Sequence, residues 1–146
     1  MTCRRIITAF LFLGILIGLS SCGKKAPPFL PAKEAFDTRV SDLQGEWEGG
    51  YALLRGGVPG PKEATDRLEG CRVIYGRYSA DNPPCDGCPI EFQGHYEFGR
   101  ETIETGAFFC KVPAETKGRI YFFRVHLAGP KGILGPPSKT VRVDAK

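Results

Sequence analysis

Six cysteines are the residues of this 146-residue chain whose types and spacing most clearly suggest chemistry. Two of them, Cys85 and Cys88, form a Cys-x-x-Cys pair within the turn-rich stretch DNPPCDGCP. A local disulfide is one possibility, because Asp-Gly permits a tight turn between the cysteines. A thiol-redox pair is the second, although it favours a helix N-terminus for its first cysteine. The third is a four-cysteine zinc site completed by Cys71 and Cys110. Pro89 and the strand-like residues after it disfavour redox chemistry, so we expect the local disulfide, with no metal and no other cofactor.

Other catalytic chemistry has little support in the sequence. The chain contains no Gly-x-Ser-x-Gly, His-Glu-x-x-His or phosphate-loop motif. Its two histidines, His95 and His126, fall in different predicted strands. Glu101 and Glu104 lie in a polar turn, whereas paired-carboxylate catalysis needs a cleft. We therefore expect no catalytic residues and a protein that is not an enzyme.

The N-terminal residues have the pattern of an export signal. Arg4 and Arg5 precede an uncharged apolar run, Ile6 to Leu19, which is shorter than the roughly 20 residues of a membrane-spanning helix. The run ends in Leu19-Ser20-Ser21-Cys22, which resembles the lipobox of bacterial lipoproteins. This resemblance implies cleavage before Cys22 and acylation of that cysteine with palmitate-like chains that anchor the protein in a membrane.

The residues after Cys22 suggest a location and a spacer. Gly23, where inner-membrane lipoproteins carry Asp, resembles outer-membrane sorting in Gram-negative bacteria, and the Cys-Gly-x-Lys start resembles small outer-membrane lipoproteins. We expect a lipid-anchored protein of the cell envelope, on the outer membrane and facing the periplasm if the cell is Gram-negative. Prolines in GKKAPPFLPAKEAFD favour an extended, semi-rigid tether.

The composition bounds what can follow the tether. Without residues 1–21 the chain has 125 residues, enough for one domain. It then carries 18 basic and 16 acidic residues, a balance too mild to indicate nucleic acid as a partner. Four cysteines remain besides Cys22, and an even number in an exported chain predicts two disulfides with three possible connectivities.

Short apolar runs separated by glycine and proline turns predict an all-β domain. The pattern indicates a seven-stranded antiparallel sandwich with no internal repeat and, in PKEATDRLEG, at most a short helical turn. The expected strands are Arg39–Trp47, Tyr51–Leu54, Cys71–Tyr78, Ile90–Phe98, Gly106–Val112, Arg119–Leu127 and Ser138–Asp144.

The segment RIYFFRVHLAGPKGILGPPSKTVRV resembles the F–G hairpin of fibronectin type III domains. Tyr121 falls at the tyrosine-corner position and Val125 at the next core position, and CRVIYGRY is similar to strand C. The resemblance implies an immunoglobulin-like sandwich. The chain departs from the family where YALLRG stands in place of the tryptophan-bearing strand B, and Trp47 is then expected to reach the core from the first strand.

Side-chain alternation assigns the faces of the strands. We expect Tyr121, Phe123, Val125 and Leu127 to point inward, together with Cys71, Val73, Tyr75, Val141 and Val143. The outward side chains of the same strands form a mixed basic and apolar patch, the predicted partner-binding face: Arg72, Ile74, Phe122, Arg124, His126 and Arg142.

If Cys85 pairs with Cys88, the second disulfide joins Cys71 to Cys110. These two cysteines fall in strands that we assign to opposite sheets, although the phase of Cys110 is left open by Phe108 and Phe109 before it. Such a bond would cross the core and contribute about 3–4 kcal/mol by restricting the unfolded chain.

These features define a domain plan and a class of function. The plan is a signal peptide at 1–21, the lipidated cysteine and tether at 22–37, and a fibronectin type III-like sandwich at 38–146. The expected function is a membrane-anchored, extracytoplasmic, non-enzymatic interaction or structural module. Its partners are the membrane, through the anchor, and an envelope protein, glycan or lipopolysaccharide. The alternatives are a periplasmic thiol-redox or metal-binding protein using Cys85 and Cys88, and an accessory lipoprotein of outer-membrane assembly or transport.

Overall fold

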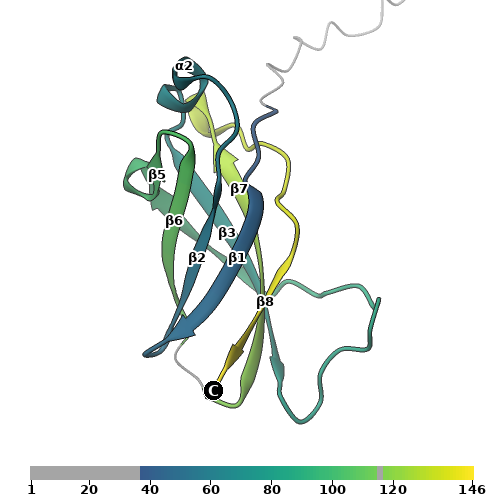
Figure 1. Cartoon of the computed structure of the whole chain (residues 1–146). Coiled ribbons are helices and arrows are strands. Elements are labelled where there is room, and N and C mark those ends of the chain that lie inside the picture. Colours follow the sequence, from purple (N-terminus) through teal and green to yellow (C-terminus); the bar gives the residue numbers. More distant parts are fainter. Residues whose placement is uncertain (1–36, 115–116) are drawn as a thin grey trace, which may run out of the picture. The chain divides into compact units, whose positions relative to one another are not determined.

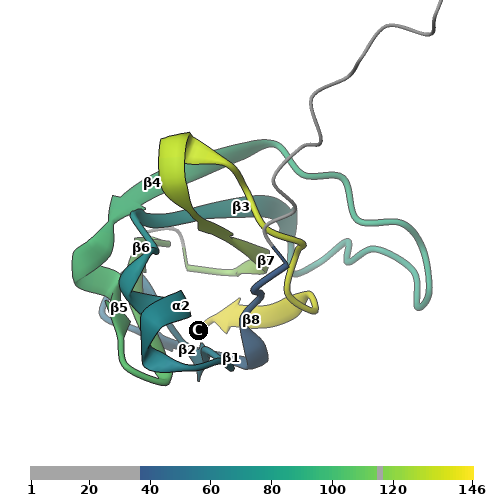
Figure 2. The same ribbon diagram turned by 90° about the horizontal axis from the view of Figure 1, so that it is seen from above.

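The computed structural model describes residues 37–114 and 117–146 and confirms the predicted all-β sandwich. Two four-stranded antiparallel sheets face each other, sheet A in the order β1-β2-β6-β5 and sheet B in the order β4-β3-β7-β8 (Figures 1 and 2). The signal sequence, Cys22 and all but the last residue of the predicted tether lie outside the described residues. The strands are β1 Ser41–Glu48, β2 Tyr51–Gly57, β3 Gly70–Ser79, β4 Gly94–Gly99, β5 Ile103–Glu104, β6 Ala107–Pro113, β7 Arg119–Ala128 and β8 Val141–Ala145.

Alternation along the strands builds the core, as the sequence predicts. In β7 the side chains of Phe123, Val125 and Leu127 are fully buried. In β6 the buried positions are Phe108, Cys110 and Val112, whereas Phe109 is half exposed. This settles the phase that the double phenylalanine leaves open, because Cys110 points between the sheets.

Several strand boundaries differ from those expected. The strand predicted to begin at Ile90 begins at Gly94, and the one predicted from Ser138 begins at Val141. Ser138 still pairs with the neighbouring strand, because its N–H donates to the Val125 carbonyl at 2.8 Å and its hydroxyl accepts from the Val125 N–H at 2.9 Å. A two-residue strand, β5, brings the total among the described residues to eight.

The stretch between β2 and β3 forms a five-residue helix, α2 Lys62–Asp66. A single arginine from elsewhere in the chain satisfies carbonyls at its end. Arg100, in the short 3-10 helix η1 Arg100–Thr102, donates to the carbonyls of Thr65 and Leu68 and lies 3.3 Å from the Asp66 carboxylate. No helix in the described part of the chain is long and apolar enough to cross a bilayer.

The edge strands β1 and β8 close one side of the sandwich, and a glycine permits their approach. A Cβ on Gly45 would lie 2.6 Å from Val143 Cγ2 and 3.0 Å from Leu54 Cδ2, inside any normal contact. Farther along β1, Trp47 packs against the core and its indole N–H donates to the Ala114 carbonyl at 3.0 Å. Trp47 therefore reaches the core from the first strand, as expected.

We predict that Gly45→Ala destabilises the domain by about 1–3 kcal/mol, because the added methyl overpacks the contact between β1 and β8. Alanine is otherwise better than glycine within a strand, so a loss isolates the steric term. Urea unfolding measures the change. The exposed neighbour Gln44→Ala is the control and should stay within about 0.5 kcal/mol of the parent. Equal stability of Gly45→Ala and the parent would show that the strands do not need this close approach.

Candidate interaction surface

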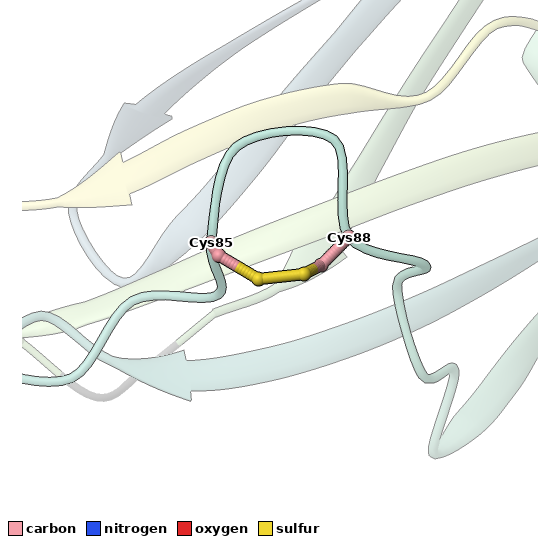
Figure 3. Close-up of a disulfide and its surroundings, with 2 residues drawn as sticks. All are labelled: Cys85 and Cys88. Atoms are coloured by element: carbon pink, nitrogen blue, oxygen red, sulfur yellow. A yellow bond between two sulfur atoms is a disulfide. The ribbon is translucent and has the colours of Figure 1, made fainter.

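The long connection between β3 and β4 carries the Cys-x-x-Cys pair and closes it as a local disulfide. Cys85 and Cys88 are bonded to each other, with their Cα atoms 5.3 Å apart (Figure 3). The Cys88 N–H donates to the Cys85 carbonyl at 3.0 Å, and Gly87 has a φ of +79°. A type II turn requires a positive φ at its third residue, and Gly87 occupies that position. The turn brings the two cysteines close enough to form the disulfide. Both cysteines are exposed.

The returning half of this connection runs along the outer face of sheet B. The Tyr78 hydroxyl accepts the Glu91 N–H at 2.8 Å, and the Gln93 N–H donates to the Tyr75 carbonyl at 2.8 Å. Gly76 provides the space, since a Cβ there would lie 2.5 Å from the Glu91 carbonyl oxygen. The chain at Ile90 and Glu91 therefore lies over the outer face of β3, whereas Gln93 is bonded beside it, and β4 starts later than predicted.

The six residues of the predicted partner-binding face do point outward, on one side of sheet B. They alternate with buried neighbours, and cross-strand pairing joins Arg72 to His126, Ile74 to Arg124 and Phe122 to Arg142. Whether this face binds a partner stays a prediction. The structure adds that the chain's own loop covers part of it, which the sequence did not reveal.

Intramolecular contacts engage most of that face. The Arg124 guanidinium lies 4.8 Å from the centre of the Phe92 ring, and its Nε donates to the Thr140 hydroxyl at 3.0 Å. Phe122 packs edge-to-face against Tyr78 at 5.6 Å between ring centres. Nδ1 of His126 is 2.8 Å from the Gly135 carbonyl oxygen, so the ring is held by the β7–β8 connection.

The remaining cations of the face have acidic neighbours. Arg72 pairs with Glu97 across β3 and β4, and its hydrogen bond and positive charge lower the pKa of the Glu97 carboxyl. Arg142 Nε lies 2.9 Å from the Asp144 carboxylate. Exposed pairs of this kind add little stability, but they orient the guanidinium groups.

An open pocket of about 300 Å³ remains where the disulfide turn meets β7 and the start of β8. The disulfide, Ile90 and Phe122 supply apolar surface, while Asp86, Thr140 and Arg142 supply polar groups. Its volume is at the lower end for small-ligand sites. The candidate surface therefore includes a pocket between loop and sheet, which is lined by two of the six predicted residues, Phe122 and Arg142. The lining residues are Pro84, Cys85, Asp86, Gly87, Cys88, Ile90, Phe122, Thr140 and Arg142.

A second exposed feature lies on the outer face of sheet A. Tyr51 and Phe109 are its two exposed large hydrophobic side chains, and each is covered by a cation. The Lys111 ammonium is 4.1 Å from the Tyr51 ring centre, and the Arg55 guanidinium is 5.7 Å from that of Phe109. Sequence reasoning missed this pair because the phase of β6 was undecided.

The other two cysteines differ from the prediction, because Cys71 and Cys110 are free thiols in the structure and not a disulfide. They lie in opposite sheets and point into the same core, so the predicted placement is right while the covalent bond is not present. Hydrogen bonding between the two thiols instead shifts the pKa of each in opposite directions. Since this pair is between the sheets and the Cys85–Cys88 pair is on an exposed loop, the four sulfurs do not converge and the four-cysteine zinc site is not formed.

The hydrogen bond makes the two buried thiols unequal. It lowers the pKa of the Cys71 thiol, against the opposing effect of burial, and raises the pKa of the Cys110 thiol together with burial. The Thr102 hydroxyl, 3.6 Å from the Cys71 sulfur, also lowers the pKa of Cys71.

Comparison with known proteins supports the fold. The structure is similar to the third fibronectin type III domain of the human KIAA0343 protein, with a TM-score of 0.58 and 15% identity over 84% of this chain and 93% of that domain. A solved structure described as a myokine structure matches with a TM-score of 0.49 and 11% identity, over 75% of this chain and 97% of that one. No protein-family model matches the chain, and no curated protein matches its sequence. The chain thus has a fibronectin type III-like fold, a class of sandwich whose members serve many roles.

We predict that Gly76→Ala displaces the returning loop from sheet B, because the new methyl meets a backbone carbonyl and not a movable side chain. Amide exchange in residues 80–93 should become faster, with a loss of about 1–3 kcal/mol in unfolding free energy. Asp86→Ala, at the exposed tip of the same loop, should leave both quantities unchanged. If exchange in 80–93 were the same in Gly76→Ala and the parent, the loop would not depend on the space that this glycine provides.

Proposed function

We propose that this protein is a membrane-anchored extracytoplasmic lipoprotein whose fibronectin type III-like sandwich is a non-enzymatic interaction module of the cell envelope. The observation that carries the proposal is the sequence Leu19-Ser20-Ser21-Cys22 directly after an apolar run led by two arginines. An anchor of more than one acyl chain is stable, because each buried CH₂ contributes about 0.8 kcal/mol. The proposed location is the outer membrane, facing the periplasm, in a Gram-negative cell.

The chemistry of the domain is in keeping with binding. Of the groups that catalysis would use, His126 is held by a backbone carbonyl and the Glu101 carboxylate accepts the Gly99 N–H at 3.0 Å. Fibronectin type III-like domains are typically binding domains, which favours a partner over a substrate. The proposed partner is an envelope protein, a glycan or lipopolysaccharide, met by the pocket between the disulfide turn and sheet B.

The tether sets how far such a module reaches. We propose that the stretch from Gly23 to Asp37, whose prolines favour an extended tether, holds the domain some tens of Å from the membrane at about 3 Å per residue. A domain held at that distance can meet partners in the space beside the membrane while remaining attached to it. An accessory role in outer-membrane assembly or transport fits the same geometry, and the Cys-Gly-x-Lys start favours it.

A thiol-redox function for Cys85 and Cys88 is the second candidate, and the exposure of both cysteines favours it. The turn that holds them argues for a structural bond, because no helix N-terminus is present there to stabilise a thiolate. A count of free thiols at these positions in glutathione buffers separates the two. A structural disulfide resists buffers poised near the glutathione potential, whereas a redox pair exchanges with them.

We predict that Cys22→Ala releases the protein from the membrane fraction, because no acyl chain can then be attached. Fractionation with a high-salt wash measures the release, and intact mass of the extracted parent should show the diacylglyceryl group and a start at residue 22. Ser21→Ala keeps a small residue before the cysteine and is the matched control, which should remain on the membrane. A Cys22→Ala protein that stays on the membrane through the salt wash refutes the lipid anchor.

We also predict that the partner meets the disulfide loop. A photo-crosslinking amino acid at position 86, on the exposed turn, should give a discrete adduct in intact cells, and one at position 44, on the outer face of β1, should not. Substitution of Phe122 by Ala, which shortens one wall of the pocket, should reduce the adduct from position 86. Equal adducts from positions 86 and 44 would show that the loop is not the preferred contact.

A further inference from the structure

We propose that the open edge of β4 pairs with the β4 of a second copy of this chain, so that sheet B continues across a two-fold axis between the copies. β4 stands at the end of the order β4-β3-β7-β8, and among the described residues it pairs with β3 and with no other strand. An edge strand presents main-chain N–H and C=O groups to which another strand can add. The six residues of β4 also determine which strand fits, and in which register.

The hydrogen bonds of sheet B show which main-chain groups face the open edge. In an antiparallel ladder, the groups of alternate residues point to opposite sides of the strand. The Ala80 N–H donates to the Gly118 carbonyl at 3.0 Å, in register with the β3–β7 ladder, so the even-numbered residues of β3 face β7 and the odd-numbered ones face β4. Those odd-numbered residues pair with the even-numbered residues of β4. His95 and Glu97 therefore direct their N–H and C=O groups away from β3.

Both ends of this edge are closed within the chain. The Gln93 N–H donates to a carbonyl of β3 at 2.8 Å, and the Gly99 N–H donates to the Glu101 carboxylate at 3.0 Å. Within the described part of the chain, no hydrogen bond engages the main-chain groups of His95 or Glu97. The open stretch is therefore short, and a strand that adds to it has to fit closely on both of its faces.

The outer face of β4 is complementary to itself. When a second β4 runs antiparallel around a two-fold axis at Tyr96, His95 of each copy lies opposite Glu97 of the other, and the two residues exchange main-chain hydrogen bonds. Both side chains are exposed on the same face, so an imidazole meets a carboxylate on each side of the axis. The neighbouring registers set Glu97 or His95 opposite itself, and like charges directly opposite each other are unfavourable.

The inner face of β4 fits in the same register. Tyr96 and Phe98 pack against the core, and the Tyr96 ring stacks on Tyr75 with 5.2 Å between the ring centres. The two-fold axis places Tyr96 beside Tyr96 of the other copy, which joins the aromatic rows of the two sheets. Phe98 then lies opposite Gly94, and an aromatic ring in that position covers the backbone of the glycine. Because one register satisfies both faces, the strand that fits is a second β4.

Disulfide trapping tests the register. Two differently tagged full-length chains are expressed together, one with His95→Cys and the other with Glu97→Cys, and the membrane extract is mildly oxidised. The Cα atoms of such a cross-strand pair lie about 5.5 Å apart, within the range of a disulfide. We expect the mixed pair to be linked several times more than either variant with itself. The parent should give no link between copies, because its exposed Cys85 and Cys88 are bonded to each other.

The same gels show the outcomes that would overturn the proposal. Equal linkage in all three combinations would indicate random collision, and no linkage would indicate that the edges do not meet. A link from position 95 to a different protein would show that another strand, and not a second copy, occupies the edge.

A main-chain substitution separates strand pairing from contact between side chains. His95→Pro removes an N–H that faces away from β3, which an edge strand tolerates, so the melting temperature should stay close to that of the parent. Sedimentation of the full chain in detergent should show a dimer for the parent and a monomer for His95→Pro. His95→Ala keeps the N–H and should weaken the dimer only in part. A dimer of His95→Pro as tight as the parent would refute the ladder.

A charge exchange tests the cross-strand pair. Glu97→Lys should lower the association constant about tenfold, because the imidazole–carboxylate pair is lost twice in a symmetric dimer. Adding His95→Glu to Glu97→Lys should restore association, whereas Glu46→Lys, the same charge change at an exposed position of β1, should have no effect. Equal effects of Glu97→Lys and Glu46→Lys would contradict the pairing. Since sedimentation in detergent does not depend on the lipid anchor, failure of this test and failure of the proposed location are distinguishable.

Discussion

The structure depends on burying one face of each sheet against the other. The inner side chains of β7, above all Phe123, Val125 and Leu127, pack on the inner side chains of β2 and β6, and the packing is complete enough that these residues are inaccessible to water. At roughly 25 cal/mol per Å² of apolar surface, this shared core is the largest favourable term in folding. Everything functional has to be placed on the two outer faces, or in connections that leave the core undisturbed.

Where every second residue of a strand is apolar, the sequence alone predicts which side chains point into the core between the sheets. Strand β7 shows this, since the inward positions Tyr121, Phe123, Val125 and Leu127 follow from the period of two alone. It fails where two aromatic residues stand side by side, as at Phe108 and Phe109. Either phase buries a phenylalanine there, and only the pairing of β6 with β2 decides between them. For that reason, the sequence did not predict that the cation-covered ring of Phe109 is exposed on sheet A.

Side-chain alternation predicted which residues form the candidate surface, but not the loop that covers part of it. The period of two identifies which side chains leave the core, and all six predicted residues do so. It carries no information about a distant segment that lies over them. The position of this segment depends on Gly76, because a side chain there would clash with the backbone at Glu91. It also depends on the Tyr78 hydroxyl, which accepts a hydrogen bond from the Glu91 N–H. A lone glycine in an otherwise β-branched and aromatic strand was the available signal, because such a glycine often marks a close backbone approach.

The two cysteine pairs illustrate how position decides what a disulfide contributes. Closing the few residues between Cys85 and Cys88 restricts the unfolded chain little, about 2 kcal/mol in the entropy model, and its main effect is to fix the shape of a turn. Closing the roughly 40 residues between Cys71 and Cys110 would restrict it more, by about 4 kcal/mol. The reduced pair is already satisfied by its hydrogen-bond chain to Thr102 and Gly99, so the fold does not require the bond in order to form.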